Sequence, residues 1–141
     1  LQLVETDMTI FFRNLSRFTN KKTSLQLIER AFYDFNTVTK EVKNKWVFWF
    51  LNYEIRLQQE EISSEERKQK MDAVNPKYVL RNYMSQLAID AADEGDYSLI
   101  DELFNLLKKP YTEQSENEKW FAKRPEWARD KVGCSMLSCS S

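Results

Sequence analysis

The stretch Trp46-Val47-Phe48-Trp49-Phe50-Leu51 is the longest apolar run of the sequence, and its conformation decides the fold class. Its aromatic and β-branched residues would also suit a β-strand. Two observations favour a helix: the flanking polar residues keep a helical register, and no partner strand is predicted nearby. We therefore expect a helix from about Glu41 to Leu57. Its first half is apolar on more than one face, which predicts that this half lies in the central core.

Five further helices are predicted from apolar residues that recur three and four positions apart. Their expected spans are about 7–15, 24–36, 64–72, 76–95 and 98–110. The expected N-caps of four of them are Asp7, Thr23 or Ser24, Ser63 or Ser64, and Asp96 or Ser98. For the helix over 76–95 the signal is Asn75-Pro76, with Asn as the N-cap and Pro as the first helical residue. Gly95 then supplies its C-terminal stop.

The chain is predicted to be all-α, a compact bundle of about six helices with an irregular C-terminal tail. Its 141 residues, 42% of them hydrophobic, provide enough apolar material for one core. Residues 1–110 form the predicted helical domain, and residues 111–141 form a docking strap and a cysteine-bearing tail. The strap residues expected to pack onto the body are Trp120, Phe121 and Trp127.

Composition excludes several classes of function. With 21 Lys and Arg against 22 Asp and Glu, the net charge of -1 gives no overall attraction for nucleic acid or an anionic membrane, so neither partner is expected. An apolar run of six residues is far shorter than the ~20 needed to span a bilayer. The absence of histidine excludes His-based acid–base catalysis and His-ligated zinc. Two glycines cannot build a glycine-rich phosphate loop.

Three acidic groups are candidates for metal binding or general acid–base chemistry: Glu60-Glu61, Glu65-Glu66 and Asp93-Glu94-Asp96. Each is better explained as a solvated helix face or a helix end. The aromatic residues from Trp46 to Tyr53 could form a stacking platform, but without a basic surround they predict core packing. Lys77 and Arg81 either anchor their helix to a neighbouring domain or are ordinary surface residues, and both interpretations stay open.

Both cysteines, Cys134 and Cys139, lie in the last eight residues. Small polar neighbours leave Cys139 accessible, but no adjacent Lys or Arg favours its thiolate form. The two could bridge each other, either could pair with a thiol elsewhere, or the terminal cysteine could be inert. They cannot complete a Cys₄ metal site, and they lack the CxxC spacing of a thiol oxidoreductase.

Residues 75–83, NPKYVLRNY, resemble the signature of the selenoprotein O (SelO, formerly YdiU) family over nine consecutive positions. The motif residues singled out as structural are Asn75, Pro76, Lys77, Tyr78, Arg81, Asn82 and Tyr83. Further landmarks follow in the family's order: Ala88-Ile89, Gly95-Asp96, Pro110-Tyr111, Glu113-Gln114, Phe121-Ala122, Pro125-Glu126-Trp127 and Ser138-Cys139-Ser140-Ser141. Residues 7–13 are similar to a weaker family stretch, which extends the resemblance to the whole chain.

The resemblance implies a parent protein with a protein-kinase-like fold that transfers AMP from ATP to hydroxyl side chains of proteins. Such a parent needs Mg²⁺ or Mn²⁺, and its ATP-holding lysine and metal-binding Asp and Asn precede this segment. No catalytic or metal-binding residue is therefore assigned here, and the segment alone should be inactive and bind no cofactor. Its expected partners are the upstream kinase-like domain of the same chain and, for the parent, its protein substrates.

Family members carry selenocysteine or cysteine at the position of Cys139, which implies a redox-sensitive contact with the body of the enzyme. Because this chain has plain cysteine there, no selenium-dependent property is expected. Cys134 is an unassigned second redox candidate that could compete with Cys139 for a partner thiol.

The start at Leu1, without a signal-like segment, indicates that further sequence lies upstream. The resemblance fits a bacterial cytoplasmic protein, which we favour, or a mitochondrial one if the source is eukaryotic. The competing class is a non-enzymatic helical module that binds a partner protein through its aromatic or Arg81-centred surface.

Overall fold

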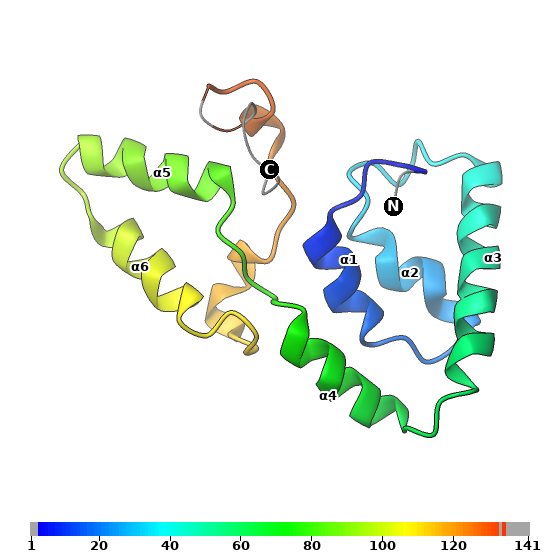
Figure 1. Ribbon diagram of the computed structural model, residues 1–141. Coiled ribbons are helices and arrows are strands. Elements are labelled where there is room, and N and C mark those ends of the chain that lie inside the picture. Colours follow the sequence, from blue (N-terminus) through cyan, green and yellow to red (C-terminus); the bar gives the residue numbers. More distant parts are fainter. Residues whose placement is uncertain (1–2, 133, 135–141) are drawn as a thin grey trace. The chain divides into compact units, whose positions relative to one another are not determined.

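The computed structural model describes residues 3–132 and 134, and its regular elements there are all helical. The six α-helices are α1 Met8–Leu15, α2 Ser24–Glu29, α3 Lys40–Leu57, α4 Ser64–Val74, α5 Asn82–Asp93 and α6 Ser98–Leu107 (Figure 1). Three 3₁₀ helices accompany them: η1 Lys21–Thr23, η2 Ser115–Trp120 and η3 Glu126–Ala128. The predicted all-α class is confirmed.

Two compact units divide the chain, residues 1–75 and residues 76–141. The boundary expected from the sequence lay at residue 110 instead. In the structure the carbonyl oxygen of Pro110 accepts hydrogen bonds from the backbone N–H groups of Lys77 (2.8 Å) and Tyr78 (3.1 Å). Residues on both sides of position 110 therefore belong to the same unit.

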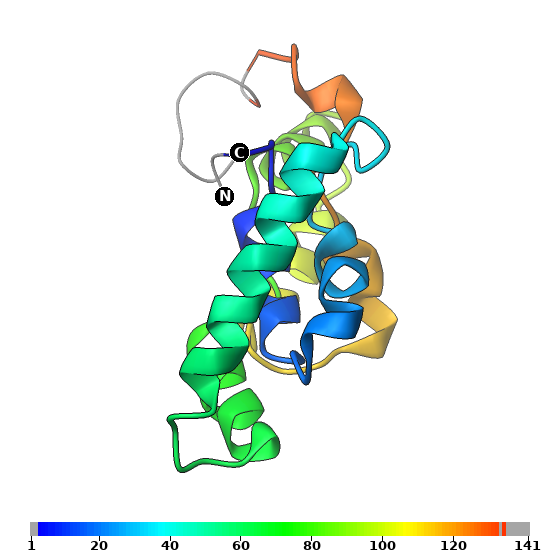
Figure 2. The same ribbon diagram turned by 90° about the vertical axis from the view of Figure 1, so that its right-hand side faces the viewer.

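Helix α3 supplies the core of the first unit (Figure 2). Trp46 and Phe50 are buried, and their rings pack against Phe11, Phe18 and Phe32 at centroid distances of 5.4 to 5.6 Å. The expectation of a helix is confirmed. The expectation that its whole first half lies in the core is wrong, because Phe48 is 65% exposed in this chain.

Helix α1 begins at the predicted N-cap, Asp7. The buried Asp7 carboxylate accepts a hydrogen bond from the backbone N–H of Ile10 at 3.0 Å, which satisfies one donor of the first helical turn. The predicted cap of α4 is confirmed: Ser63 is the N-cap, and its Oγ accepts from Glu66 N at 3.1 Å. The predicted cap of α6 is wrong, because its N-cap is Tyr97, which makes no side-chain cap bond; Asp96 Oδ1 accepts from Ser98 N one residue earlier in the chain.

Replacing Asp7 with alanine should lower the free energy of unfolding by about 1 kcal/mol, because the first turn of α1 loses its capping acceptor. Urea denaturation followed by tryptophan fluorescence measures the change. Asp7→Asn is the matched control, since its side-chain oxygen still accepts the bond. An equal loss in both variants would show that the charge, and not the cap, supplies the stability.

Helix α2 ends at Glu29, earlier than the predicted end near residue 36. Beyond it the backbone pairs with the segment before α1: Asp7 N donates to Ala31 O at 2.7 Å, and Tyr33 N donates to Glu5 O at 3.3 Å. An isolated β-bridge joins Thr6 and Phe32. Tertiary pairing has therefore replaced the last helical turns that the apolar spacing predicted.

The predicted helix start at Asn75-Pro76 is wrong. Asn75 is the C-cap of α4, where its backbone and side-chain N–H groups both donate to Met71 O, and α5 begins at Asn82. Asn75 is extended, as expected for a residue before proline, and proline's fixed φ suits an extended segment as well as a first helical turn. In the structure residues 76–81 are not helical, and the N–H groups of Lys77 and Tyr78 donate to Pro110 as described above.

In the second unit, α5 and α6 form the predicted helical hairpin (Figure 1). Gly95 lies between them with φ +87°, a conformation that favours glycine, and its N–H donates to Ala92 O at 2.9 Å. After α6, the indole N–H of Trp120 donates to Glu102 at 2.8 Å, and the ring of Trp127 meets Tyr83 edge-on. These contacts hold the predicted strap on the hairpin.

No helix in the described part of the chain is long and apolar enough to cross a membrane.

Candidate functional site

The NPKYVLRNY motif holds two buried cations in the second unit. The exposed fractions of Lys77 and Arg81 are 4% and 5%. Ordinary surface exposure, one of the two interpretations left open by the sequence, is therefore excluded for both. Residues 76–81, which carry both side chains, are not helical in the structure, and Arg81 is extended.

Lys77 is the centre of a polar cluster whose partners come from the strap. Its Nζ donates to Glu113 Oε2 and Glu118 Oε2, both at 2.6 Å. The same ammonium lies 5.5 Å from the ring centroid of Tyr78 and 5.2 Å from that of Phe121, both buried. Sequence reasoning missed this cluster, because nothing in the local pattern pairs position 77 with positions 113 and 118.

Burial alone would lower the pKa of Lys77, but its hydrogen bonds to Glu113 and Glu118 outweigh burial and raise the pKa above the ordinary value. The side chain is therefore held as an ammonium ion, with its donors directed to carboxylates of the same unit. A lysine acts as a nucleophile or general base only when its pKa is lowered. The geometry thus assigns Lys77 a structural role.

Tyr78 extends the same cluster. Its side chain is 1% exposed, and its hydroxyl donates to the backbone carbonyl of Gln114 at 2.9 Å. Gln114 Nε2 in turn donates to the carbonyl oxygens of Leu106 and Lys109 at the end of α6. The motif, the strap and the C-terminus of α6 are thereby joined by hydrogen bonds.

Tyr78→Phe should lower the free energy of unfolding by about 1 kcal/mol, since a part-buried carbonyl loses its donor while the ring is retained. Thermal or urea denaturation gives the value. Tyr97→Phe serves as control because Tyr97 is 62% exposed. If the two variants were equally stable, the hydroxyl bond to Gln114 would contribute nothing.

The remaining motif residues also have structural positions. Asn82 is the first residue of α5, Tyr83 is buried against Trp127, and Asn75 caps α4. The Asn75 carbonyl also accepts from the buried guanidinium of Arg13 at 3.1 Å within the first unit. No described contact gives any of them a catalytic geometry.

Three of the acidic candidates have local partners. Glu60 meets Arg56 at 3.3 Å and Glu66 meets Lys70 at 2.8 Å, each four residues away. Hydrogen bonds from Ser98 lower the pKa of Asp96, because they stabilise its charged form. Within residues 3–132 and 134, no three Asp, Glu or Cys side chains gather as metal ligands.

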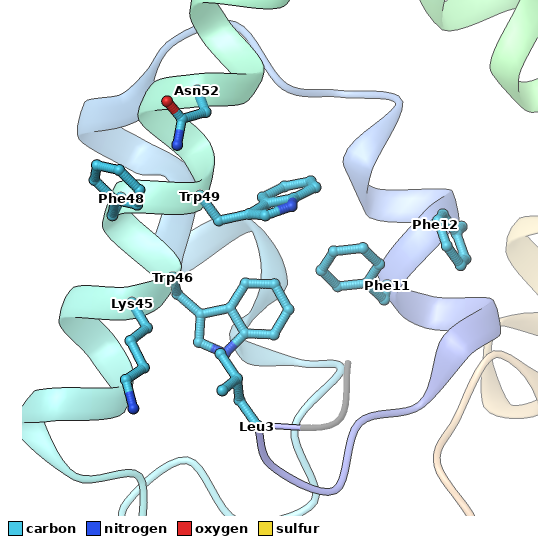
Figure 3. A pocket seen from close by; sticks show the side chains of 8 residues that line it. All are labelled: Leu3, Phe11, Phe12, Lys45, Trp46, Phe48, Trp49 and Asn52. Atoms are coloured by element: carbon cyan, nitrogen blue, oxygen red, sulfur yellow. The ribbon is translucent and has the colours of Figure 1, made fainter.

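The first unit carries an aromatic pocket that sequence reasoning assigned wholly to the core. Its volume is about 370 Å³ (Figure 3). The lining residues are Leu3, Phe11, Phe12, Lys45, Trp46, Phe48, Trp49 and Asn52. Phe11, Trp46 and Trp49 face one another between α1 and α3 in Figure 3. The signal that could have revealed it was the apolar residues on more than one face of α3.

The structure describes one of the two redox candidates, Cys134, but not the other, Cys139. Cys134 is a free cysteine with a fully buried side chain. Cys139 lies outside the described residues, so its contacts and the possible bridge to Cys134 stay predictions.

Comparison with known proteins gives one consistent result. The model of the family described as protein adenylyltransferase SelO matches residues 1–108. A protein nucleotidyltransferase YdiU of Flavobacterium johnsoniae is 61% identical over 100% of this chain. Proteins of the same name from Rhodopirellula baltica and Aromatoleum aromaticum are 46% and 44% identical, again over the whole chain. The chain spans only 28%, 28% and 27% of the length of these three relatives.

Proposed function

The chain belongs to the protein adenylyltransferase SelO family, and from this premise we propose that it is the C-terminal helical segment of a protein nucleotidyltransferase. The parent transfers AMP from ATP to hydroxyl side chains of proteins. The observation that carries this proposal is the 61% identity to a protein nucleotidyltransferase over the whole chain, together with the family match.

In this proposal the parent has a kinase-like fold, and ATP and its Mg²⁺ or Mn²⁺ bind upstream of this chain. The described residues do not fit either group. They gather no set of three potential metal ligands, and the chain's two glycines, at positions 95 and 133, provide no phosphate loop. Lys77, whose ammonium is directed to Glu113 and Glu118, does not supply a phosphate-binding cation.

The segment's own task is to support the kinase-like core. The hydrogen bonds that join the motif, the strap and α6 support this role, because they fix the hairpin and leave no reactive group at their centre. Transfer to a hydroxyl requires an in-line attack on the α-phosphate with metal ions neutralising the polyphosphate charge. Those groups belong to the rest of the parent.

Mass spectrometry of an acceptor protein tests the reaction. After incubation with full-length parent, ATP and Mg²⁺, serine, threonine or tyrosine side chains should gain the mass of an AMP moiety. The isolated 141-residue chain should give no adduct. Addition of a phosphoryl group in place of AMP would overturn the proposed reaction.

Cys139 is the proposed redox-regulatory residue of the parent. Two thiols, that of Cys139 and one elsewhere in the parent, lose two electrons and two protons to a peroxide and form a disulfide, while the peroxide is reduced to water or an alcohol. Cys134 is a poorer partner because its buried side chain has little access to an oxidant or a second thiol.

Cys139→Ser should make the AMP transfer of the full-length parent insensitive to peroxide, whereas Cys134→Ser should respond as the unmodified protein does. Activity measured before and after peroxide, and again after thiol reduction, gives the comparison. Unchanged sensitivity of Cys139→Ser would reject the proposed switch.

A non-enzymatic interaction module is the second candidate. An apolar groove of about 420 Å³ on the α5–α6 hairpin favours it, with Leu80, Ile89, Ile100 and Phe104 all exposed there. The sequence of the intact gene upstream of Leu1 distinguishes the two candidates: kinase-like nucleotide motifs support the transferase, and a start codon supports the module. For the transferase, the bacterial relatives favour a cytoplasmic location.

A further inference from the structure

Helix α3 carries large apolar side chains on a face that this chain does not cover. Val47, Phe48 and Trp49 are 41%, 65% and 39% exposed, while their neighbours Trp46 and Phe50 are buried. A helix that is apolar on more than one face is normally buried on all of them inside a larger protein. We therefore expect the exposed face of α3 to be buried by another part of a larger protein.

The aromatic pocket lies at this face, and its size suits side chains of another segment. Trp46 and Trp49 have ring centroids 6.0 Å apart, and Phe11 lies 5.4 and 6.1 Å from them. The volume of about 370 Å³ falls in the range of pockets that enclose a ligand or a few side chains. Phe48 lines the same pocket and also belongs to the exposed face of α3, so the pocket and that face are continuous.

Trp46 offers no accessible polar atom at the pocket, because its indole Nε1 is enclosed within this chain. Leu3, which also lines the pocket, is half-exposed. The described part of the pocket therefore suits an apolar group rather than a hydrogen-bonding one.

Charge argues against an anionic occupant. Among the described residues that line the pocket, Lys45 is the only cation, and its Nζ lies 2.7 Å from Glu41 Oε1. The other described lining residues are aromatic or aliphatic except for the neutral amide of Asn52. The occupant that fits is an uncharged apolar side chain, as any folded polypeptide can supply.

We propose that this pocket and the exposed face of α3 receive apolar side chains from the upstream part of the same parent polypeptide. The inference rests on the proposed function, which makes this chain one segment of a longer protein. The chain spans 28% of its 61%-identical relative, so most of that relative's polypeptide lies outside the segment and is available as the cover. An apolar side chain of that part fills the space beside Phe48.

Hydroxyl-radical footprinting of the full-length parent tests the proposal. After correction for intrinsic reactivity, Phe48 and Trp49 should be modified at least about fivefold more slowly than Tyr97, because a covered interface excludes water. Tyr97 is the reference since its exposed fraction in this chain, 62%, is close to the 65% of Phe48, and it lines neither apolar site. Modification of Phe48 at the rate of Tyr97 would overturn the proposal.

Two further measurements identify the occupant. Phe48→Asp should restore fast labelling of Trp49 in the parent, whereas Ile55→Asp, at an exposed position of the same helix outside the pocket, should not. Protection should also be independent of protein concentration, because the cover belongs to the same chain. Protection that disappears on dilution would assign the face to a second copy and reject the proposal.

The footprint is read without reference to activity, so it separates this inference from the proposed function. A parent that transfers AMP while Phe48 stays fully reactive would refute the covered face alone. A parent that protects Phe48 but transfers no AMP would support the covered face and refute the proposed reaction.

Discussion

Phe50→Ala should lower the free energy of unfolding of the first unit by about 3 to 5 kcal/mol, the usual cost of removing a buried phenylalanine ring. Phe50 has no exposed surface, and its ring stacks on Phe18 at 5.4 Å and meets Trp49 edge-on at 5.0 Å. The neighbouring aromatic rings cannot collapse fully into the space that alanine leaves. Urea denaturation followed by tryptophan fluorescence measures the loss.

Phe48→Ala is the matched control for Phe50→Ala. Both residues lie on α3 and both changes remove the same ring, but Phe48 is 65% exposed in this chain. In the isolated chain its removal should cost less than about 1 kcal/mol, as for other surface substitutions. Equal losses in the two variants would show that the described packing of α3 is wrong.

Lys77→Met should lower the stability of the second unit by about 3 kcal/mol, because removing one member of a buried ion pair leaves the other without a partner. The expected cost lies at the low end for such pairs, since Glu113 and Glu118 are about half-exposed and water can solvate them. Denaturation of the chain at neutral pH measures it. Lys119→Met is the control: its ion pair with Glu102 is equally short at 2.6 Å, but Lys119 is 59% exposed. An exposed pair of this kind contributes about 1 kcal/mol or less.

The Lys77 effect should also depend on pH. The pKa of Lys77 is raised in the folded chain above its ordinary value of 10.5, so the ammonium binds its proton more tightly when folded. Its contribution is therefore complete below pH 10.5 and is lost as the pH rises through the folded-state pKa. The stability difference between the unmodified chain and Lys77→Met should shrink in that alkaline range. A difference that stays constant there would show that packing of the lysine stem, and not its charge, is responsible.

Helix type was predictable where local signals agree with tertiary structure. The stretch from Trp46 to Leu51 is helical, and Asp7 and Ser63 act as N-caps, because those features depend on spacing and on atoms within four residues. Prediction failed where distant backbone pairs decide the conformation. The backbone after α2 pairs with residues 5–7, and the N–H groups of Lys77 and Tyr78 pair with Pro110 in a segment that is not helical.

The candidate site, too, was predictable only where local sequence signals decide its structure. The importance of the NPKYVLRNY motif was visible from the sequence, but its chemistry was not, because Lys77 finds its partners 36 and 41 residues away. The exposure of Phe48 was equally hidden: an apolar helix face predicts burial without saying which part of the polypeptide provides it. Both points concern contacts that no local pattern encodes.

Labelling with ATP that carries a radioactive α-phosphate tests the central claim most directly, with three preparations compared on one acceptor protein. These are the full-length parent, the parent lacking the residues of this chain, and the chain alone. The account predicts label in the acceptor from the full-length parent only, because the segment supports the kinase-like core without containing its reactive groups. Label transferred by the chain alone, or undiminished transfer by the truncated parent, would contradict it.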